Sequence, residues 1–202
     1  MLKIGTRLFL APIVAALAVF AAVSPSEAAW LFYHRPAYEG RILDGESGGP
    51  IEGAVVVAIY NKQTFDLPGP SSGIIHVKET VTDKDGRFRI PSYTTLINPF
   101  AWGSEVGFTI FKPGYASINE HKRLEGVFTN KDPDEPENPW YGSFKIKFGP
   151  GKVSLPRISD RKDRLRSHDL IAMMPEVSDK SPLLKNAVRD DYKAIWARED
   201  SR

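Results

Sequence analysis

The amino-acid sequence predicts a mostly β protein, an antiparallel β-sandwich or barrel, with a helical tail at its C-terminal end. The 202 residues are enough for one ordinary domain with attachments. From Tyr38 to about Phe148, short runs rich in Val, Ile, Phe, Tyr and Thr alternate with turn-forming Gly, Pro, Asp and Asn, as in all-β domains. After Gly151 the charge becomes strongly mixed, and the apolar residues adopt a helical period.

The N-terminal segment has the pattern of a secretory signal peptide. Lys3 and Arg7 precede an apolar stretch from Leu8 to Val23, which is shorter than the roughly 20 residues that a membrane-spanning helix needs. Ser26 and Ala28 place small residues at the two positions that signal peptidase reads. We therefore expect removal of residues 1–28, export to the periplasm or the medium, and no membrane span in the mature chain. A retained N-terminal anchor is the alternative.

Six runs have the composition of strands, and two weaker ones accompany them. The run Ala54–Asn61 is almost continuously apolar, so we expect it at the centre of a sheet. The run Phe144–Phe148 alternates, so Lys145 and Lys147 should both face solvent. The other clear runs are Glu39–Asp44, Ile74–Thr82, Arg87–Ile90 and Val106–Lys112, and the weaker ones are His121–Phe128 and Val153–Leu155.

Three segments have the composition of long surface loops. Lys62–Gly73 is rich in Pro, Gly and Ser, and Asn130–Pro139 combines prolines with four carboxylates. The third, Pro91–Gly103, carries Trp102. Gly69–Gly73 matches the residue pattern of the Gly-x-Ser-x-Gly elbow of hydrolases but not its structural context, because no alternation of predicted strand and helix surrounds it. The acidic segment is most simply a solvated connection, although its carboxylates could bind a hard cation weakly.

Residues 151–202 form a charged tail with one clear helix, predicted over 182–197. Ser181 provides an N-cap and Pro182 suits the first helical position. An isolated helix of this length is marginal in water, so we expect it to dock on its own sheet or on a partner. Its apolar stripe consists of Leu184, Val188, Tyr192 and Ile195, at spacings of four, four and three.

Two further features of the tail are less regular. The segment Arg157–Arg166 holds five basic residues against two acids, which indicates a solvated face or an electrostatic contact with an acidic partner. A short apolar turn is predicted from Asp169 to Met174, where Pro175 stops it.

Charge and cysteine content exclude several classes of function. The 27 basic and 25 acidic residues nearly cancel, so nucleic acid is not an expected partner. The chain has no Cys, which rules out disulfides, cysteine-ligated metals, a thiol nucleophile and a lipidated cysteine. The four histidines lie in four separate segments without the spacing of a zinc peptidase. We therefore expect no metal site, no cofactor and no catalytic residues.

Three stretches of the sequence resemble segments of one known protein family and occur in the same order as in that family. They are GRILDGESGGPIEGAVVVAIYN, ETVTDKDGRFRIPSY and FTIFKPGYAS. Together, over roughly Tyr38 to Tyr115, they resemble a carboxypeptidase regulatory-like domain, and the mature chain resembles small exported bacterial proteins of this kind. The resemblance implies a transthyretin-like (prealbumin-like) Greek-key antiparallel β-sandwich of about seven strands, placed here at 38–150 after a short segment, 29–37. In this family the module is an accessory or binding unit without catalytic activity.

The aromatic residues Trp102, Trp140 and Tyr141 are the candidate ligand-binding residues. Each lies in or next to a predicted loop, where recognition residues tend to sit; the alternative is that these rings cap the core. We expect a non-catalytic exported module that binds or supports another cell-envelope component, either a protein or a polysaccharide. A glycan-binding module that uses these rings is the second hypothesis, and an unrecognised enzyme is the third.

The signal peptide gives a direct prediction. Processing should occur between Ala28 and Ala29, because the small-x-small pattern follows the apolar stretch directly. N-terminal sequencing of the exported protein should therefore begin at Ala29, and a sequence that begins at Met1 would contradict the prediction.

Overall fold

The computed structural model describes residues 32–66, 69–97, 101–120, 123–129, 140–141, 144–172 and 175–197. Over these residues the chain is mostly β, as predicted, and its C-terminal part is helical. The predicted signal peptide, residues 1–28, and the acidic segment Asn130–Pro139 lie outside the described residues. None of the described helices is long and apolar enough to cross a membrane.

One sheet has the strand order β4-β3-β7-β8 and is antiparallel throughout. Its central strand β3 lies between β4 and β7, and residues 54–60 are all buried. The prediction that this apolar run is central is therefore confirmed, since a strand needs such a run only where both of its faces are covered. The strands are β3 (Val55–Asp66), β4 (Gly69–Val81), β7 (Ala101–Phe111) and β8 (Ile118–Glu120).

The second large sheet has the order β11-β12-β2-β5. It contains one parallel pair, β12 with β2, so the expectation of purely antiparallel pairing is wrong at this position. A parallel partner must come from a distant part of the chain, because a tight hairpin makes antiparallel neighbours. The strands are β2 (Tyr38–Asp44), β5 (Arg87–Ile90), β11 (Lys147–Gly149) and β12 (Lys152–Leu155).

Two short ribbons and a short helix complete the β region. β1 (Phe32–Arg35) pairs with β6 (Tyr93–Leu96), and β9 (Trp140–Tyr141) pairs with β10 (Phe144–Lys145). The β1–β6 ribbon is packed on β3 by aromatic rings, because Tyr60 lies 6.3 Å from Tyr33 and 4.8 Å from Tyr93 between ring centroids. The helix α2 (Arg123–Phe128) inserts Leu124, Val127 and Phe128 into the core between the large sheets.

The two large sheets share one hydrophobic core. Every second side chain of β3, at Val56, Ala58 and Tyr60, points into it, and Phe88 and Ile90 of β5 meet them from the other sheet. Burying a Val, Ile or Phe side chain supplies about 1.5–3 kcal/mol, so this core is a major source of stability. The remaining described residues with the largest fully buried side chains include Tyr38, Phe108, Ile42, Ile110, Ile118, Ile146 and Leu155.

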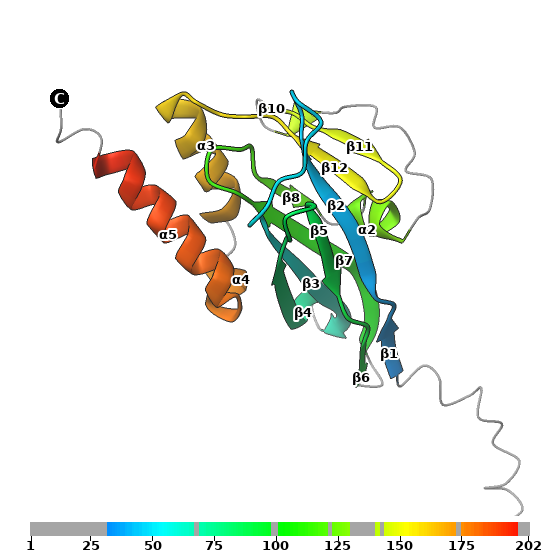
Figure 1. Cartoon of the computed structure of the whole chain (residues 1–202). Coiled ribbons are helices and arrows are strands. Elements are labelled where there is room, and N and C mark those ends of the chain that lie inside the picture. Colours follow the sequence, from blue (N-terminus) through cyan, green and yellow to red (C-terminus); the bar gives the residue numbers. More distant parts are fainter. Residues whose placement is uncertain are drawn as a thin grey trace, which may run out of the picture.

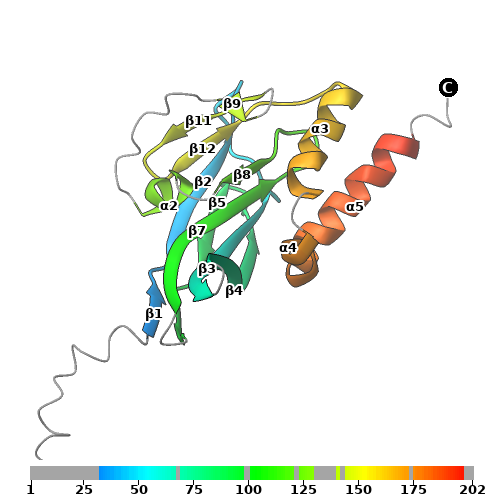
Figure 2. The same cartoon turned by 180° about the vertical axis from the view of Figure 1, so that it is seen from behind.

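Three helices cover the outer face of the β4-β3-β7-β8 sheet. They are α3 (Arg161–Ala172), α4 (Pro175–Lys180) and α5 (Pro182–Ala197), and both views place them together on one side of the molecule (Figures 1 and 2). The alternate residues of β3, Val55, Val57 and Ile59, form a second apolar cluster with Leu184 of α5 and Val177 of α4. The tail helix spans 182–197, as predicted. Of the two docking surfaces expected for it, its own sheet or a partner, the structure shows contact with its own sheet.

The N-terminus of α5 is capped by a strand residue. The amides of Leu183 and Leu184 donate hydrogen bonds to the carboxylate of Glu79 on β4, at 2.9 and 3.1 Å. The first amides of a helix lack intrahelical partners, and a negative charge is favourable beside them. Ser181 does not supply a side-chain cap, because its hydroxyl donates to the carbonyl of Val177. The start of the helix was therefore predicted correctly, but its side-chain cap was not.

Several predicted loops are strands. Lys62–Gly73 is the tip of the β3–β4 hairpin, and Ser71 of the Gly-x-Ser-x-Gly match lies 2.7 Å from the Thr64 hydroxyl across it. Pro and Gly are tolerated there because β4 is an edge strand. Pro91–Gly103 contains β6 and the beginning of β7. The weak strand candidate His121–Phe128 is wrong, because it contains the helix α2.

The region 38–150 packs with strands on either side of it. The ribbon strand β1 and the strand β12 belong to the same body as 38–150, and the apolar turn expected at Asp169–Met174 is the end of the longer helix α3. The described strands also outnumber the seven expected. Lys145 and Lys147 are both exposed on either side of the buried Ile146, as the alternation predicted.

The turn before β5 gives a stability prediction with an internal control. Gly86 and Gly48 both have φ of 71°, so Gly→Ala at either position should cost about 1–2 kcal/mol through left-handed strain. A Cβ at Gly86 would also lie 2.5 Å from the carbonyl oxygen of Ile42, whereas nothing lies within 4 Å at Gly48. Gly86→Ala should therefore lower the free energy of unfolding more than Gly48→Ala does in chemical denaturation. Equal losses would contradict this close contact.

Candidate functional site

The outer face of the β11-β12-β2-β5 sheet carries a concentration of positive charge. Side chains of this sheet alternate between core and solvent; Phe88, Ile90, Val153 and Leu155 are buried, and the residues between them face outward. The cations that face outward, called the basic face below, are Arg41, Arg87, Arg89, Lys147 and Lys152. Glu39 is the one carboxylate that these strands place among them.

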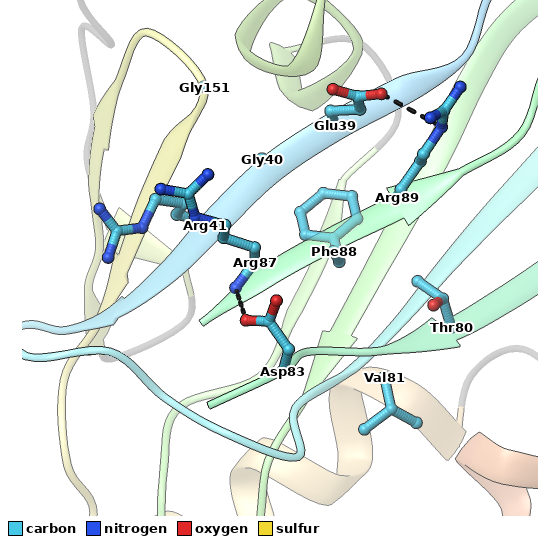
Figure 3. Close-up of a pocket in the computed structure, with 10 residues that line it drawn as sticks. All are labelled: Glu39, Gly40, Arg41, Thr80, Val81, Asp83, Arg87, Phe88, Arg89 and Gly151. Carbon is cyan, nitrogen blue, oxygen red and sulfur yellow. Dashed lines mark hydrogen bonds and ion pairs between the residues drawn. The ribbon is translucent and has the colours of Figure 1, made fainter. Parts of the chain in front are cut away.

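An open pocket of about 610 Å³ crosses the basic face. Gly151 lies at one end of it, β2 and β5 form its middle, and Val81 of β4 lies at the other end (Figure 3). The close-up shows the Arg41 and Arg87 side chains extending to the same side of β2, while Arg89 turns toward Glu39. The pocket is thus lined by guanidinium groups, and its size is within the range of ligand sites, about 300–1,000 Å³.

Only one of the three pocket arginines has a carboxylate partner. Arg89 lies 3.2 Å from Glu39, but both side chains are well exposed, so this ion pair contributes little stability. Arg41 donates two hydrogen bonds, at 3.2 and 3.0 Å, to the carbonyl oxygen of Asp85. Arg87 donates its backbone N–H to Asp83, which leaves its guanidinium without an ion pair among the described residues. The arrangement can therefore accept anionic oxygen atoms from a ligand.

The interior carboxylate of Glu125 has a structural role. It accepts hydrogen bonds from the hydroxyl of Tyr38 at 2.9 Å and the amide of Val106 at 3.0 Å, and it lies 3.4 Å from Arg35. Burial, and secondarily the charge of Glu125, raises the pKa of Tyr38 well above its ordinary value. This cluster joins α2, β1, β2 and β7.

A second carboxylate, Asp44, ties the start of the helical tail to β2. It accepts hydrogen bonds from the amides of Glu46 and Ser47, from the Arg157 guanidinium at 2.5 Å and from the Tyr115 hydroxyl at 2.9 Å. These donors, the Ser47 amide first, hold the pKa of Asp44 well below its ordinary value. The carboxylate is buried and saturated, so it stabilises the fold.

A third cluster joins α3 to α5. The Nε2 atom of His168 lies 2.7 Å from the Asp191 carboxylate, which also pairs with Arg164. Both His168 and Asp191 are buried, and the Nδ1 atom of His168 has no hydrogen-bond partner among the described residues. No hydroxyl nucleophile is therefore held by this His–Asp pair, and the pair fixes α5 to α3 instead.

The three predicted aromatic residues are not brought together by any contact that the structure describes. Trp102 lies on β7 opposite Gln63, not in a loop, and is 46% exposed. Trp140 and Tyr141 lie on β9, and their side chains lie outside the described part of the chain. Of the three, Trp102 is thus the ring with a demonstrated solvent-facing surface.

The described residues contain no group of three potential metal ligands. Of the described histidines, His34 bonds to Thr94, His76 stacks on Tyr93 and His168 pairs with Asp191. The turn at Asp83–Gly86 binds its own backbone, because the Asp83 carboxylate accepts the amides of Asp85 and Arg87.

The basic face is the feature that sequence reasoning missed. Its only local signal is the alternation of Arg with apolar residues in Arg87–Ile90 and around Arg41. The near-zero net charge of the whole chain concealed it, since acidic residues elsewhere balance the sum. The gathering of the cations depends on strand register, which sequence alone does not supply.

Comparison with known proteins leaves the activity open. No family model matches the chain, and no curated protein matches it. The chain is similar to a solved 3-chlorocatechol 1,2-dioxygenase from Rhodococcus opacus 1CP, with 16% identity, a TM-score of 0.31, and coverage of 62% of this chain and 60% of that chain. It is also similar to a 9R-lipoxygenase from Cyanothece PCC8801, with 15% identity, a TM-score of 0.23, and coverage of 56% and 19%. At such TM-scores neither likeness carries an argument about fold or activity.

The buried Asp44 predicts a specific acid sensitivity. Its pKa is lower in the folded chain than the ordinary value of 3.8, so its stabilising effect is complete above that value and is lost as the pH falls below it. Asp44→Asn should lower stability at neutral pH and remove part of the decline in stability at acid pH. Denaturation midpoints from pH 7 down through this range measure both effects. Asp169→Asn, at an exposed position on α3, is the control, and an Asp44 variant with the acid profile of the wild type would contradict the assignment.

Proposed function

We propose that this protein is a non-catalytic exported module that binds or supports another component of the cell envelope. The observation that carries the proposal is the difference between the two large sheets. Helices α3, α4 and α5 cover one of them, whereas the other presents the basic face and its pocket to solvent. Charged side chains held on a rigid sheet are a means of recognising a partner.

The proposal includes membership of the carboxypeptidase regulatory-like family and a transthyretin-like Greek-key β-sandwich. The family-like stretches lie in β2, β3, β4, β5 and β7, and the two sheets that hold them pack on one core. Export to the periplasm or the medium is supported by the N-terminal pattern of charged, apolar and small residues. An accessory module of this kind requires a partner, which we take to be an envelope protein or polysaccharide.

A binding role, in preference to catalysis, is supported by the state of the interior polar groups. The buried carboxylates Asp44 and Asp191 and the partly buried Glu125 are each held by two or more donors within the fold. None of them lines the pocket on the basic face. A general acid or base needs access to a substrate, so these carboxylates are better explained as structural contacts that join helices and strands.

Glycan binding through loop aromatics is the second candidate. One observation favours it: the ring of Trp102 is 46% exposed although it lies on a strand. An exposed ring can stack on the apolar face of a sugar, and its energetic contribution would be concentrated at that residue. Trp140 and Tyr141 would complete the surface in this hypothesis.

Co-sedimentation with isolated cell envelopes tests the proposal and separates the two candidates. Wild-type mature protein should pellet with the envelopes, and Arg41→Glu with Arg87→Glu should remain in the supernatant, because two charges on the basic face are reversed. Trp102→Ala should pellet like the wild type. Lys193→Glu, an exposed charge reversal on α5, is the matched control, and thermal melts establish that each variant is folded.

Two results would change the conclusion. Loss of binding in Trp102→Ala with retention in the double arginine variant would favour the glycan-binding candidate. Absence of the wild-type protein from the pellet, under conditions in which it is folded, would contradict the binding role itself.

A further inference from the structure

The basic face contains a straight row of three cations contributed by neighbouring strands. Arg87 of β5 lies directly opposite Arg41 of β2, and Arg41 lies directly opposite Lys152 of β12. Neighbouring strands are about 4.8 Å apart, so the backbone positions of the row span about 10 Å across the sheet. The pocket follows the same direction, from Gly151 beside β12 to Val81 on β4 (Figure 3).

The positive charge of this row is not neutralised within the described part of the chain. Arg41 is bound to a neutral acceptor, the carbonyl of Asp85. The two carboxylates that line the pocket are engaged elsewhere, because Glu39 pairs with Arg89 and Asp83 accepts backbone amides. Like charges directly opposite each other destabilise a sheet. The row therefore has a cost for folding that an anionic ligand would relieve.

The remaining composition of the face restricts the class of ligand. The large apolar side chains that are exposed in the described chain lie mainly elsewhere, for example at Phe32, Leu96 and Trp102, and only Val81 borders the pocket. Phe88 is buried beneath the face. A neutral glycan or a single-stranded nucleic acid would need exposed rings for stacking, and a bilayer surface would favour apolar side chains that insert. The composition of the basic face therefore favours a ligand that is recognised by its charge.

We propose that the row Arg87–Arg41–Lys152 binds a linear polyanion of the cell envelope whose repeat carries phosphate or carboxylate groups. The inference rests on the proposed binding function and names its ligand class. The polymer lies across the strands along the pocket, so successive anionic groups meet successive cations. The guanidinium groups offer two parallel donors to a phosphate or carboxylate, and the ammonium group of Lys152 acts as a point charge. Release of counterions from the polymer drives the association.

Salt-dependent binding measured with defined probes tests this inference. Fluorescently labelled inorganic polyphosphate and polygalacturonate supply the phosphate and carboxylate arms, dextran is the uncharged control, and vesicles containing phosphatidylglycerol supply a charged membrane. The wild-type protein should bind at least one polyanion and not dextran. Arg41→Gln, Arg87→Gln and Lys152→Gln should each weaken binding several-fold and lower the slope of log K against log salt by about one.

The matched control is Lys193→Gln on α5, which removes the same charge from an exposed site remote from the basic face. It should retain the affinity and the salt slope of the wild type. An equal loss in Lys193→Gln, binding to vesicles without binding to either polymer, or no binding to either polymer would each overturn the inference. If the protein nevertheless sediments with envelopes through the basic face, the proposed function stands and only the ligand class is wrong.

Discussion

The burial of residues 55–60 of β3 on both faces is the constraint on which the rest of the structure depends. One set of its alternate side chains belongs to the core between the two large sheets, and the other set belongs to the apolar cluster under α4 and α5. A strand with no polar face must be covered on both sides. The chain supplies one cover from β2, β5 and β12 and the other from its C-terminal tail, and Glu79 and Asp191 fix the position of α5 within that second cover.

This layered arrangement determines where function can reside. The helical layer occupies the outer face of one sheet, and the buried carboxylates are used to join elements. The basic face is then left as a broad charged surface, on a rigid sheet, that none of the described helices covers. Because opposed like charges do not help a sheet to fold, the row Arg87–Arg41–Lys152 is better explained by what it binds than by what it stabilises.

The sequence predicts the elements whose signals are local. Ala54–Asn61 and α5 were recognised from unbroken apolar composition and from helical spacing, respectively. The outer halves of β3 and β4 were missed because Gly69–Gly73 is rich in Pro, Gly and Ser, which an edge strand tolerates. The helix α2 was missed because six residues are too few to show a period. The β12–β2 pairing and the row of cations join residues that are distant in the chain, so no local pattern encodes them.

Hydrogen exchange of the α5 amides in the isolated protein tests the layered account most directly. Because a free helix of this length is marginal in water, its amides exchange slowly only if its apolar side chains, such as Leu184 and Val188, are packed on β3. The account predicts strong protection along 184–195, comparable to that of β3, without any added partner. Exchange of these amides at the rate of an unfolded peptide would contradict it. The outer face of the β4-β3-β7-β8 sheet would then lack its helical cover, and the two large sheets would no longer differ in whether helices cover them.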